Sequence, residues 1–449
     1  MLRPSGFPEY SPAEQLVFDE IKSIIEKSYQ QFGYAHIQTP AVEANSVLLS
    51  KNGEETGKQI FGLYGLAQGA EDAKDYSLHF DLTVPFARYV LDRENELAFP
   101  FKRFQIQPVR RGERAQRGRF RELRQADIDV IRQDGEEKNI GKNLFYDAEM
   151  LLVIAKTLKQ IIAKYINNKP FTLHVNNRYL LAGVTAQFPA EKREEIYGLL
   201  DRFYKITPEK FAEEMNALLG KDTKKMLEFT SYSLEKLPKD LVDNDEYRRG
   251  YTELQEVFTS LKMLNLKNEY KIVFDPYIIR GLDYYTGTVY EAFLDEDIAL
   301  GSISAGGRYE NLTGYINPKK KNFSGVGGSI GLSRLMFLIL ENYTPAHTTQ
   351  TKYLFVNFAE TIKETTSLML DFAKDGTCVE LYPTADKLGK QFGYADKKGI
   401  PYVVILGEGE MKEKNLQGQK YEDWRRRNEK TLIIDYKKMG AYAPIYRNR

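Results

Sequence analysis

Residues 101–131 read FKRFQIQPVRRGERAQRGRFRELRQADIDVI and form the most informative segment of the chain. The apolar residues Phe104 and Ile106 predict a first strand, which an Arg- and Gly-rich loop follows. The second strand alternates apolar with polar residues, Ala126, Ile128 and Val130 with Gln125, Asp127 and Asp129. Because successive side chains of a strand point to opposite faces, the segment predicts a β-hairpin with one polar face.

The same segment is strongly basic. Residues 100–125 hold nine basic and two acidic side chains, whereas the whole chain of 449 residues has a net charge of only +1. All but one of the nine are arginines, whose guanidinium groups fork onto phosphate oxygens, and Gly112 and Gly118 allow a ligand to approach closely. A solvated charged face is the alternative interpretation. The carboxylates beside the arginines favour a site that holds an anion and an amine-bearing small molecule together.

Composition and length describe an ordinary globular chain. With 42% hydrophobic and 28% charged residues, a disordered or fibrous class is excluded, and the length predicts two to four domains. The single cysteine, Cys378, cannot form an intramolecular disulfide, so we expect a reducing, cytoplasmic location. No signal peptide, membrane-spanning helix or metal site is expected, since the apolar runs are short and the four histidines are scattered.

Local patterns divide the chain. A helix is expected from Ser11, as N-cap of a capping box with Glu14, to Gly33, and another over 141–167, with short strands between them. This arrangement is typical of an α+β fold. Residues 169–268 form a mainly helical insertion, strands return over 269–341, and the polar residues 342–352 form a linker. Residues 353–449 are expected to be a small α/β domain with a largely parallel sheet.

Three segments resemble the signature motifs of class II aminoacyl-tRNA synthetases. Arg111-Gly112-Glu113, with its basic loop and return strand, resembles motif 2. Residues 325–335, GVGGSIGLSRL, are similar to motif 3, and residues 33–40, GYAHIQTP, with Glu43, are similar to motif 1. The resemblance implies a catalytic domain built on an antiparallel β-sheet flanked by helices, made of residues 1–168 and 269–341. It also implies a homodimer formed through motif 1.

Two further segments narrow the resemblance to histidyl-tRNA synthetases. Residues 279–291, IRGLDYYTGTVYE, closely resemble the first histidine-specific motif of that family, and residues 304–310, SAGGRYE, are similar to the second. Without the family, a β-hairpin with paired tyrosines would explain them as well. Residues 387–396 and 399–407 look like the family's anticodon-binding domain. The implied activity is ATP-dependent conversion of L-histidine to histidyl-adenylate and its transfer to tRNA(His).

The resemblance assigns expected roles at the reaction centre. Arg111, Arg280 and Arg334 match the arginines that contact the ATP phosphates, and Glu113 and Gly331 complete the ATP site. Mg²⁺ is implied as an ion bridging ATP phosphates, without a metal site made of protein ligands alone. The expected histidine-binding residues are Asp81, Thr83 and Gln125 at the ammonium group, and Asp129, Tyr284 and Tyr285 at the ring.

Contacts with tRNA are expected from two regions. Arg114, Gln116 and Arg117 lie in the motif 2 loop, which in the family meets the acceptor end. In the C-terminal region, one helical face is expected to present Lys387, Lys390, Gln391 and Tyr394 to the anticodon. Tyr394 could equally be a core residue, and the run Arg425-Arg426-Arg427 equally an exposed helix face. The tail after Asp435 has no predicted partner.

Three residues depart from the family pattern. Leu123 stands where many relatives carry an aromatic residue that stacks on adenine, Ser333 replaces the acid before the motif 3 arginine, and Ala305 replaces a glycine. Two other functions compete with tRNA charging: the histidine-binding regulatory subunit of ATP phosphoribosyltransferase, and a plain RNA-binding module. The regulatory subunit lacks the anticodon-binding domain, and an RNA-binding module would not need the complete set of ATP and histidine ligands.

Overall fold

The computed structural model describes residues 4–50, 57, 59–67, 75–133, 144–265, 267–279, 285–320, 322–345, 347–374, 376–407 and 433–435. The chain divides into two compact units, Met1–Pro8 with Ile21–Tyr343, and Glu9–Glu20 with Thr344–Arg449. Among the described residues, no helix is both long enough and apolar enough to cross a membrane.

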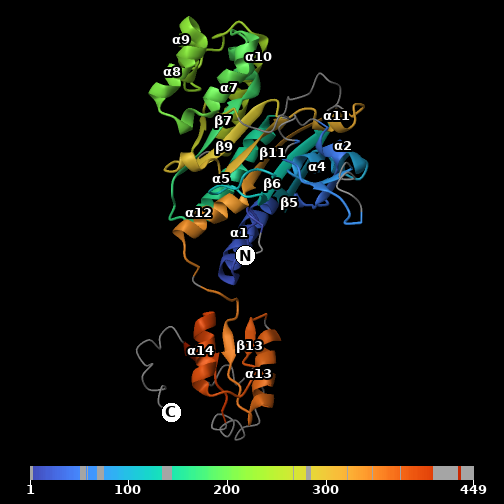
Figure 1. Ribbon diagram of the computed structural model, residues 1–449, viewed down its shortest axis with the longest axis vertical. Helices are drawn as coiled ribbons and strands as arrows, with labels where there is room; N and C mark the ends of the chain where they lie inside the picture. The colour runs from blue at the N-terminus through green and yellow to red at the C-terminus, as the bar shows by residue number, and fades with distance from the viewer. Residues whose placement is uncertain are drawn as a thin grey trace. The chain divides into compact units, whose positions relative to one another are not determined.

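The first unit is built on an eight-stranded sheet (Figure 1). In spatial order its strands are β1 (Ala35–His36), β5 (Phe101–Arg110), β6 (Glu122–Gln133), β11 (Phe323–Gly331), β10 (Ser304–Tyr309), β9 (Thr288–Leu294), β7 (Phe171–Asn177) and β8 (Ile272–Phe274). Neighbours are antiparallel from β5 to β7, whereas β1 pairs with β5 and β8 with β7 in parallel. The expected antiparallel sheet is therefore correct for the central six strands, and the complete sheet is mixed.

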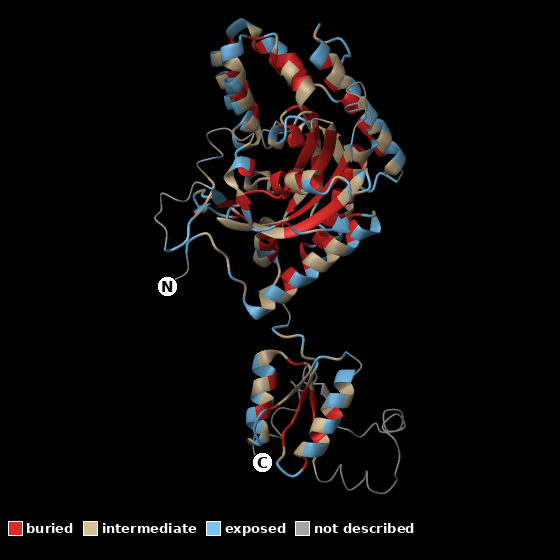
Figure 2. Cartoon of the chain, turned by 90° about the vertical axis from the view of Figure 1, so that its right-hand side faces the viewer, coloured by how far each residue is buried: buried red, intermediate tan, exposed pale blue. Residues whose placement is uncertain are grey.

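Helices cover both faces of this sheet, and others gather at one end of the unit. They are α1 (Pro12–Gln31), which belongs to this unit from Ile21 onward, α2 (Asn45–Leu48), α4 (Thr83–Asp92), α5 (Phe145–Tyr165), α6 (Arg178–Thr185), α7 (Arg193–Asp201), α8 (Pro208–Leu219), α9 (Thr223–Thr230), α10 (Asp245–Leu264), α11 (Leu312–Ile316) and α12 (Leu332–Asn342). The buried strands lie between helices whose outer sides are exposed (Figure 2). A second, three-stranded sheet has the order β2 (Val42–Ala44), β4 (Tyr76–Leu78), β3 (Gly62–Leu63).

The helix over 12–31 begins as the sequence predicts. The amide of Ser11 donates to the Glu14 carboxylate at 2.7 Å, and the amide of Glu14 donates to the Ser11 hydroxyl at 3.4 Å. This reciprocal pair is a capping box, which satisfies two amides that the first turn of a helix leaves open. The left-handed residue that ends α1 is Gly33, with a φ of +79°.

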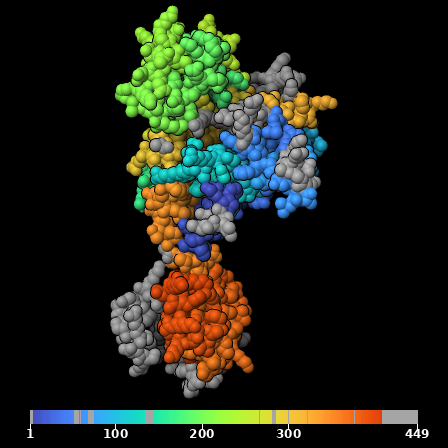
Figure 3. Space-filling view, in the orientation of Figure 1, coloured from blue at the N-terminus to red at the C-terminus, as the bar shows by residue number. Residues whose placement is uncertain are grey.

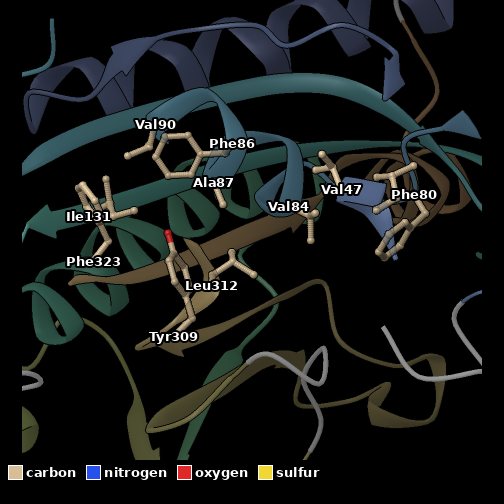
Figure 4. Packing of buried hydrophobic residues seen from close by; sticks show 11 residues of the cluster. Val47, Phe80, Val84, Phe86, Ala87, Val90, Ile131, Tyr309, Leu312 and Phe323 are labelled. Carbon is tan, nitrogen blue, oxygen red and sulfur yellow. The ribbon is translucent and has the colours of Figure 1, made fainter. Parts of the chain in front are cut away.

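The two faces of β6 have different neighbours. Ala126, Ile128 and Val130 are buried on the face that α1 and α5 cover, where the Tyr29 hydroxyl donates to the Ala126 carbonyl at 3.2 Å. On the opposite face Ile131 joins a core cluster with Phe86 and Val90 of α4 and Phe323 of β11 (Figure 4). The polar residues of β6 share this second face. The alternation in the sequence thus predicts correctly which side of the strand is polar.

Paired glycines let β10 and β11 accommodate a tyrosine. Gly306 lies opposite Gly328 in the antiparallel register. A Cβ atom at Gly306 would lie 2.5 Å from the Tyr290 hydroxyl oxygen, and one at Gly328 would lie 1.6 Å from it. No side chain fits at such distances, so these two positions require glycine for close packing rather than for backbone freedom.

The helical insertion begins later than the expected boundary at residue 169. Phe171–Asn177 forms β7, which pairs with β9 inside the main sheet, so the helical part starts at Arg178. Phe171, Leu173 and Val175 alternate with polar residues as in a strand, but this short signal lies next to a region of helical composition, and it does not show which strand is the partner. Helices α7, α8, α9 and α10 gather at one end of this unit (Figures 1 and 3). Helix α10 also packs against α6 and α5.

The C-terminal residues form a separate α/β sandwich. Its elements are β12 (Tyr353–Phe355), α13 (Ile362–Lys374), β13 (Val379–Leu381), α14 (Leu388–Lys398), β14 (Tyr402–Val404) and β15 (Ile433–Asp435). The strand order is β13-β12-β14-β15, parallel except for β15. Leu354 and Val403 pack with Ala395 of α14, whereas Phe355 and Val404 pack with Leu368 of α13. Each helix therefore covers one face of the sheet, which confirms the expected fold of this region.

Candidate functional site

A cavity of about 300 Å³ lies on the polar face of β6, between the β5–β6 hairpin, β10, β11 and the start of α12. Eight of the predicted site residues line this cavity: Asp81, Thr83, Arg111, Glu113, Gln125, Tyr285, Gly331 and Arg334. They come from four separate parts of the sequence. The structure thus brings into one site residues that only the family resemblance had connected.

The turn that follows β5 holds Arg111 and Glu113. The backbone amide of Arg111 donates to the Arg121 carbonyl at 2.8 Å, and its Nε donates to the Phe80 carbonyl at 3.1 Å. Arg121 in turn donates from its Nε to the carbonyl of Glu113 at 3.1 Å. These bonds fix the backbone of the turn and the direction of the Arg111 guanidinium, which lines the cavity.

Arg334 is placed by the first turn of α12. Its Nη1 donates to the Ser302 carbonyl at 2.6 Å, and its Nε donates to the Gly118 carbonyl at 3.4 Å. The guanidinium therefore joins the loop before β10 to the motif 2 loop. With Arg111, it supplies the cavity with two positive charges, which suits an anionic ligand with several oxygens.

Hydrogen-bond acceptors gather on the floor of the same cavity. Asp81 and Thr83 lie at the start of α4, where the Val84 amide donates to Oδ1 of Asp81 at 3.4 Å. Gln125 donates from Nε2 to the Ser329 hydroxyl at 3.2 Å. Within the described part of the chain, three buried lining atoms lack a hydrogen-bond partner: Gln125 Oε1, Asp127 Oδ1 and Ser304 Oγ. Such atoms are costly unless a ligand or water pairs with them, which favours a polar ligand carrying donors.

Asp127 is a site residue that the family resemblance did not assign. It is 4% exposed, lines the cavity, and has a raised pKa, because burial disfavours its charge more than Arg103, Ser329 and Arg111 favour it. The signal that could have found it is the alternation in the second strand, which places it on the same face as Gln125. A cationic group in the cavity would stabilise its charged form.

Asp129, predicted to line the ring pocket, lies below the cavity instead. It is 1% exposed, pairs with the Arg103 guanidinium at 2.6 Å, and accepts the Tyr309 hydroxyl at 3.0 Å. Burial raises its pKa to about 7, while Arg103 opposes the rise. These buried partners hold the carboxylate in place, and the role of Asp129 at the histidine ring stays a prediction. Asp129 lies two residues beyond Asp127 on the same face of β6, and at that position the strand no longer borders the cavity.

Two predicted residues lie outside the described part of the chain. Arg280 and Tyr284 belong to the first histidine-specific motif, of which the structure describes Ile279 and then Tyr285 onward. Tyr285 lines the cavity, and the Thr286 amide donates to the Arg308 carbonyl at 2.8 Å, which anchors the middle of this motif to β10.

The departures from the family pattern have local explanations. Ser333, in place of an acid, accepts a 2.8 Å hydrogen bond from the Arg124 amide and so joins α12 to β6. Leu123 lines the cavity and presents aliphatic surface there, next to Phe120 on the same lining. Ala305 also lines the cavity, so its methyl group is accommodated.

The residues predicted to meet the acceptor end lie on an exposed loop. Arg114, Gln116 and Arg117 are all exposed. Arg117 pairs with the Glu341 carboxylate at 2.8 Å, at the end of α12. Both partners are partly solvated, so this pair contributes little stability and leaves Arg117 accessible to another anion.

The predicted anticodon face of α14 is only partly available. Lys387 and Lys390 are at the surface, and Lys390 pairs with Asp386 at 2.8 Å. Tyr394 is half-buried: its hydroxyl donates a hydrogen bond to the Glu380 carboxylate, and its ring packs edge-to-face with the ring of Tyr382.

The prediction for Gln391 is corrected. It is 0% exposed and bonded to the backbone of Asn357, through an amide at 2.9 Å and a carbonyl at 3.0 Å, and to the Asp386 carbonyl at 2.7 Å. These bonds fix the start of α14 to the end of β12. The helical spacing of Lys387, Lys390, Gln391 and Tyr394 could not show that Gln391 is buried, because buried and exposed positions fit the same helical periodicity.

No cluster of three or more His, Cys, Asp or Glu side chains with metal-binding geometry occurs in the ranges that the structure describes. The acidic residues of the cavity come from three places in the chain: Asp81 just before α4, Glu113 in the loop after β5, and Asp127 in β6.

Comparison with known proteins places the chain in context. The family model described as histidyl-tRNA synthetase matches residues 6–335, and the model described as anticodon binding domain matches residues 352–431. The histidine–tRNA ligase of Clostridium tetani is 38% identical over 434 residues, which cover 93% of each chain. That of Clostridium acetobutylicum is 36% identical over 92% of this chain and 95% of its own.

Solved structures agree with these matches. The crystal structure of histidyl-tRNA synthetase from Nostoc sp. PCC 7120 superposes with a TM-score of 0.76 at 32% identity, covering 90% of this chain and 91% of the other. A Bacillus halodurans protein described as an ATP phosphoribosyltransferase regulatory subunit/histidyl-tRNA synthetase superposes with a TM-score of 0.71 at 19% identity, over 90% of this chain and 97% of its own. This second likeness concerns the fold alone.

Proposed function

The chain belongs to the histidyl-tRNA synthetase family, and from that premise we propose how its residues carry out the reaction of a histidine–tRNA ligase. The carboxylate of L-histidine attacks the α-phosphorus of ATP, pyrophosphate leaves, and the histidyl-adenylate then acylates the 3′ end of tRNA(His), releasing AMP. The observation that supports this most is that one cavity has arginines as well as carboxylate and amide acceptors in its lining.

Arg111, Arg334 and Arg280 are the proposed phosphate ligands. The activation step needs little covalent chemistry from the protein, because positioning and cations at the developing negative charge lower its barrier. Arg111 and Arg334 are already held by backbone carbonyls at Phe80 and Ser302, so little reorganisation is required of them. Glu113, on the turn with Arg111, is proposed to accept a hydrogen bond from the adenine amino group. Gly331 is proposed to leave room beside the nucleotide.

The ammonium group of histidine is proposed to bind among Asp81, Thr83, Gln125 and Asp127. An ammonium group has three donors and no acceptor, which complements the unpartnered oxygens Gln125 Oε1 and Asp127 Oδ1. The imidazole ring is proposed to lie against Tyr285 and Tyr284, with Asp129 acting from beneath the lining. Because the lining is polar, an apolar amino acid would leave buried groups unpaired and be rejected strongly.

Mg²⁺ is proposed to arrive with ATP. The described residues offer separated carboxylates in the cavity and no cluster of three, which fits an ion held chiefly by phosphate oxygens and water. Such an ion would neutralise phosphate charge. Arg111 and Arg334 would orient the phosphates in either case.

Binding of tRNA is proposed at two places. The exposed loop with Arg114, Gln116 and Arg117 adjoins the cavity, where the acceptor end must arrive. In the C-terminal unit Lys387 and Lys390 remain the candidates for the anticodon, together with the accessible part of Tyr394. We propose a cytoplasmic location, since that is where tRNA charging for protein synthesis takes place.

A homodimer is proposed through the segment similar to motif 1. Its strand β1 forms one edge of the main sheet, and both of its residues are exposed. Large apolar residues are exposed on and beside the small sheet that follows, including Val42 at 42%, Tyr64 at 50% and Tyr76 at 57%. A second copy of this chain is the proposed cover, and a sedimentation mass near twice 51.8 kDa would support it.

The regulatory-subunit alternative is not favoured, because an anticodon-binding domain is present and the curated relatives are ligases. Histidine-dependent exchange of pyrophosphate into ATP tests the activation chemistry. Wild-type protein should exchange with histidine and not with other amino acids. Arg280→Ala should nearly abolish exchange without unfolding the protein, and normal exchange in that variant would remove Arg280 from the mechanism.

A further inference from the structure

The segment before α1 contacts the base of the motif 2 hairpin. The carbonyl oxygen of Gly6 accepts two hydrogen bonds, from the amides of Arg121 at 2.8 Å and Glu122 at 3.1 Å. Gly6 has a φ of +86°, and a Cβ atom there would lie 2.9 Å from Cγ and 3.1 Å from the backbone nitrogen of Arg121. Both the backbone conformation and the close approach therefore require glycine at this position.

Arg121 transmits this contact to the nucleotide ligands. Its backbone nitrogen is bound by Gly6, while its carbonyl accepts the Arg111 amide at 2.8 Å. Its side-chain Nε donates to the Glu113 carbonyl at 3.1 Å. One residue thus joins the N-terminal segment to both ends of the turn that carries Arg111 and Glu113.

The other side of the turn is held from a neighbouring segment. The Gly112 amide donates to the Gln59 carbonyl at 2.7 Å, and a Cβ at Gly112 would lie 3.3 Å from that oxygen. Two residues further along, the Phe61 ring lies 6.3 Å from the ring of Phe7, next to Gly6. The N-terminal segment therefore contacts both supports of the turn.

We propose that residues 4–8 are a positioning element for the ATP-binding turn 111–113, with Gly6 and Arg121 as positioning residues. This inference rests on the proposed function of Arg111 and Glu113. The two side chains must reach the α-phosphate and the adenine at the same time, from a three-residue turn that leads into an exposed loop. Rigid support of the turn avoids the ordering cost of binding and keeps the phosphate ligand in its reactive geometry.

The test compares two glycines that both have a positive φ. Gly376, with a φ of +73° and nothing within 4 Å of an added Cβ, is the control for Gly6. Pyrophosphate exchange is measured for full-length wild type, Gly6→Ala, Gly376→Ala, Arg121→Ala and the double variant Gly6→Ala/Arg121→Ala. The Michaelis constants for ATP and histidine are determined separately, with thermal unfolding of each protein.

Gly6→Ala should lower kcat/KM for ATP by about tenfold or more, because small misplacements of reacting groups are costly, and leave KM for histidine within about twofold. Gly376→Ala should leave both constants within about twofold of wild type. The double variant should be little worse than the more impaired single variant, since both changes break one support.

Equal kinetics for Gly6→Ala and Gly376→Ala would overturn the proposal, as would fully additive losses in the double variant. If Gly6→Ala does not fold, the comparison of Arg121→Ala with wild type decides, and an unchanged kcat/KM for ATP in that variant overturns the proposal. Lack of histidine-dependent exchange in wild type would instead contradict the proposed function, so the two failures are distinguishable.

Discussion

The Arg103 guanidinium lies 2.6 Å from the Asp129 carboxylate across the β5–β6 hairpin, and both side chains are buried. Arg103 also donates to the Gln105 side chain at 3.2 Å and to the Leu82 carbonyl at 3.4 Å. Leu82 lies between the proposed histidine ligands Asp81 and Thr83. The ion pair therefore joins the hairpin to the start of α4 and supports the cavity from beneath.

Removing one partner of this pair should destabilise the protein strongly. Asp129→Ala leaves the Arg103 charge buried without its counterion, which typically costs about 3–5 kcal/mol. We expect a large fall in the midpoint of thermal or denaturant unfolding. Asp92→Ala, which breaks a surface pair in which Asp92 is 59% exposed, is the matched control and should cost less than about 1 kcal/mol. Similar effects of the two variants would contradict a buried, supporting role for Asp129.

Asp127→Asn should weaken histidine binding selectively. The change keeps the size of the side chain and removes the charge that we propose faces the ammonium group. A hydrogen bond to a charged group contributes about 1.5–3 kcal/mol, so KM for histidine should rise roughly 10- to 100-fold. KM for ATP should stay within about twofold in pyrophosphate exchange. An unchanged KM for histidine would remove Asp127 from the site.

The raised pKa values beneath the cavity predict a pH dependence. A carboxyl group whose pKa is raised in the folded protein takes up a proton as the pH falls through that value, and Asp129 does so at about 7 while the pKa of Asp127 is also raised. Loss of negative charge weakens ammonium binding, so KM for histidine should rise between pH 8 and pH 6.

The ring of histidine titrates in the same range, so the matched comparison is Asp129→Asn. This variant should show a smaller rise in KM, because the carboxyl group with a pKa of about 7 is gone. Parallel profiles in the two proteins would mean that Asp129 contributes nothing to the pH dependence.

The contact between Tyr290 and Gly328 predicts that a change at Tyr290 restores stability lost by a change at Gly328. Gly328→Ala places a methyl group against the Tyr290 hydroxyl and should destabilise by about 1–3 kcal/mol or more. Tyr290→Phe removes the hydroxyl, which has no hydrogen-bond partner among the described residues, and alone should be nearly neutral. Unfolding of the double variant should recover part of the loss. No recovery would mean that another contact excludes the side chain.

Much of the fold could be predicted from local patterns. The capping box at Ser11, the alternation in β6 and the short apolar strands of the C-terminal unit each depend on neighbours in sequence, and each is confirmed. The strand Phe171–Asn177 is missed because the helical composition of residues 169–268 as a whole outweighs its short local alternation. Its place in the sheet depends on pairing with β9, more than 100 residues away. The parallel edges of the sheet have the same long-range origin.

The site shows the same division. The family motifs name Arg111, Arg334 and several acceptors that the structure brings to one cavity, yet only the packed structure separates Asp127, on the lining, from Asp129, beneath it. The two residues have the same type, strand and face, so the difference arises from Arg103 and Tyr309, which surround Asp129. Gln391 is a similar case, since backbone groups of Asn357 and Asp386 bury a side chain whose helical spacing suited the surface.

Aminoacylation tests the central claim most directly. Full-length protein is incubated with ATP, Mg²⁺, tRNA(His) and radiolabelled histidine, and the label in precipitated tRNA is measured, with Arg111→Ala as the inactive comparison. The account predicts charging of tRNA(His) by wild type and its loss in the variant. Binding of ATP and histidine by wild type without any labelled tRNA would contradict it and would favour a regulatory histidine-binding protein.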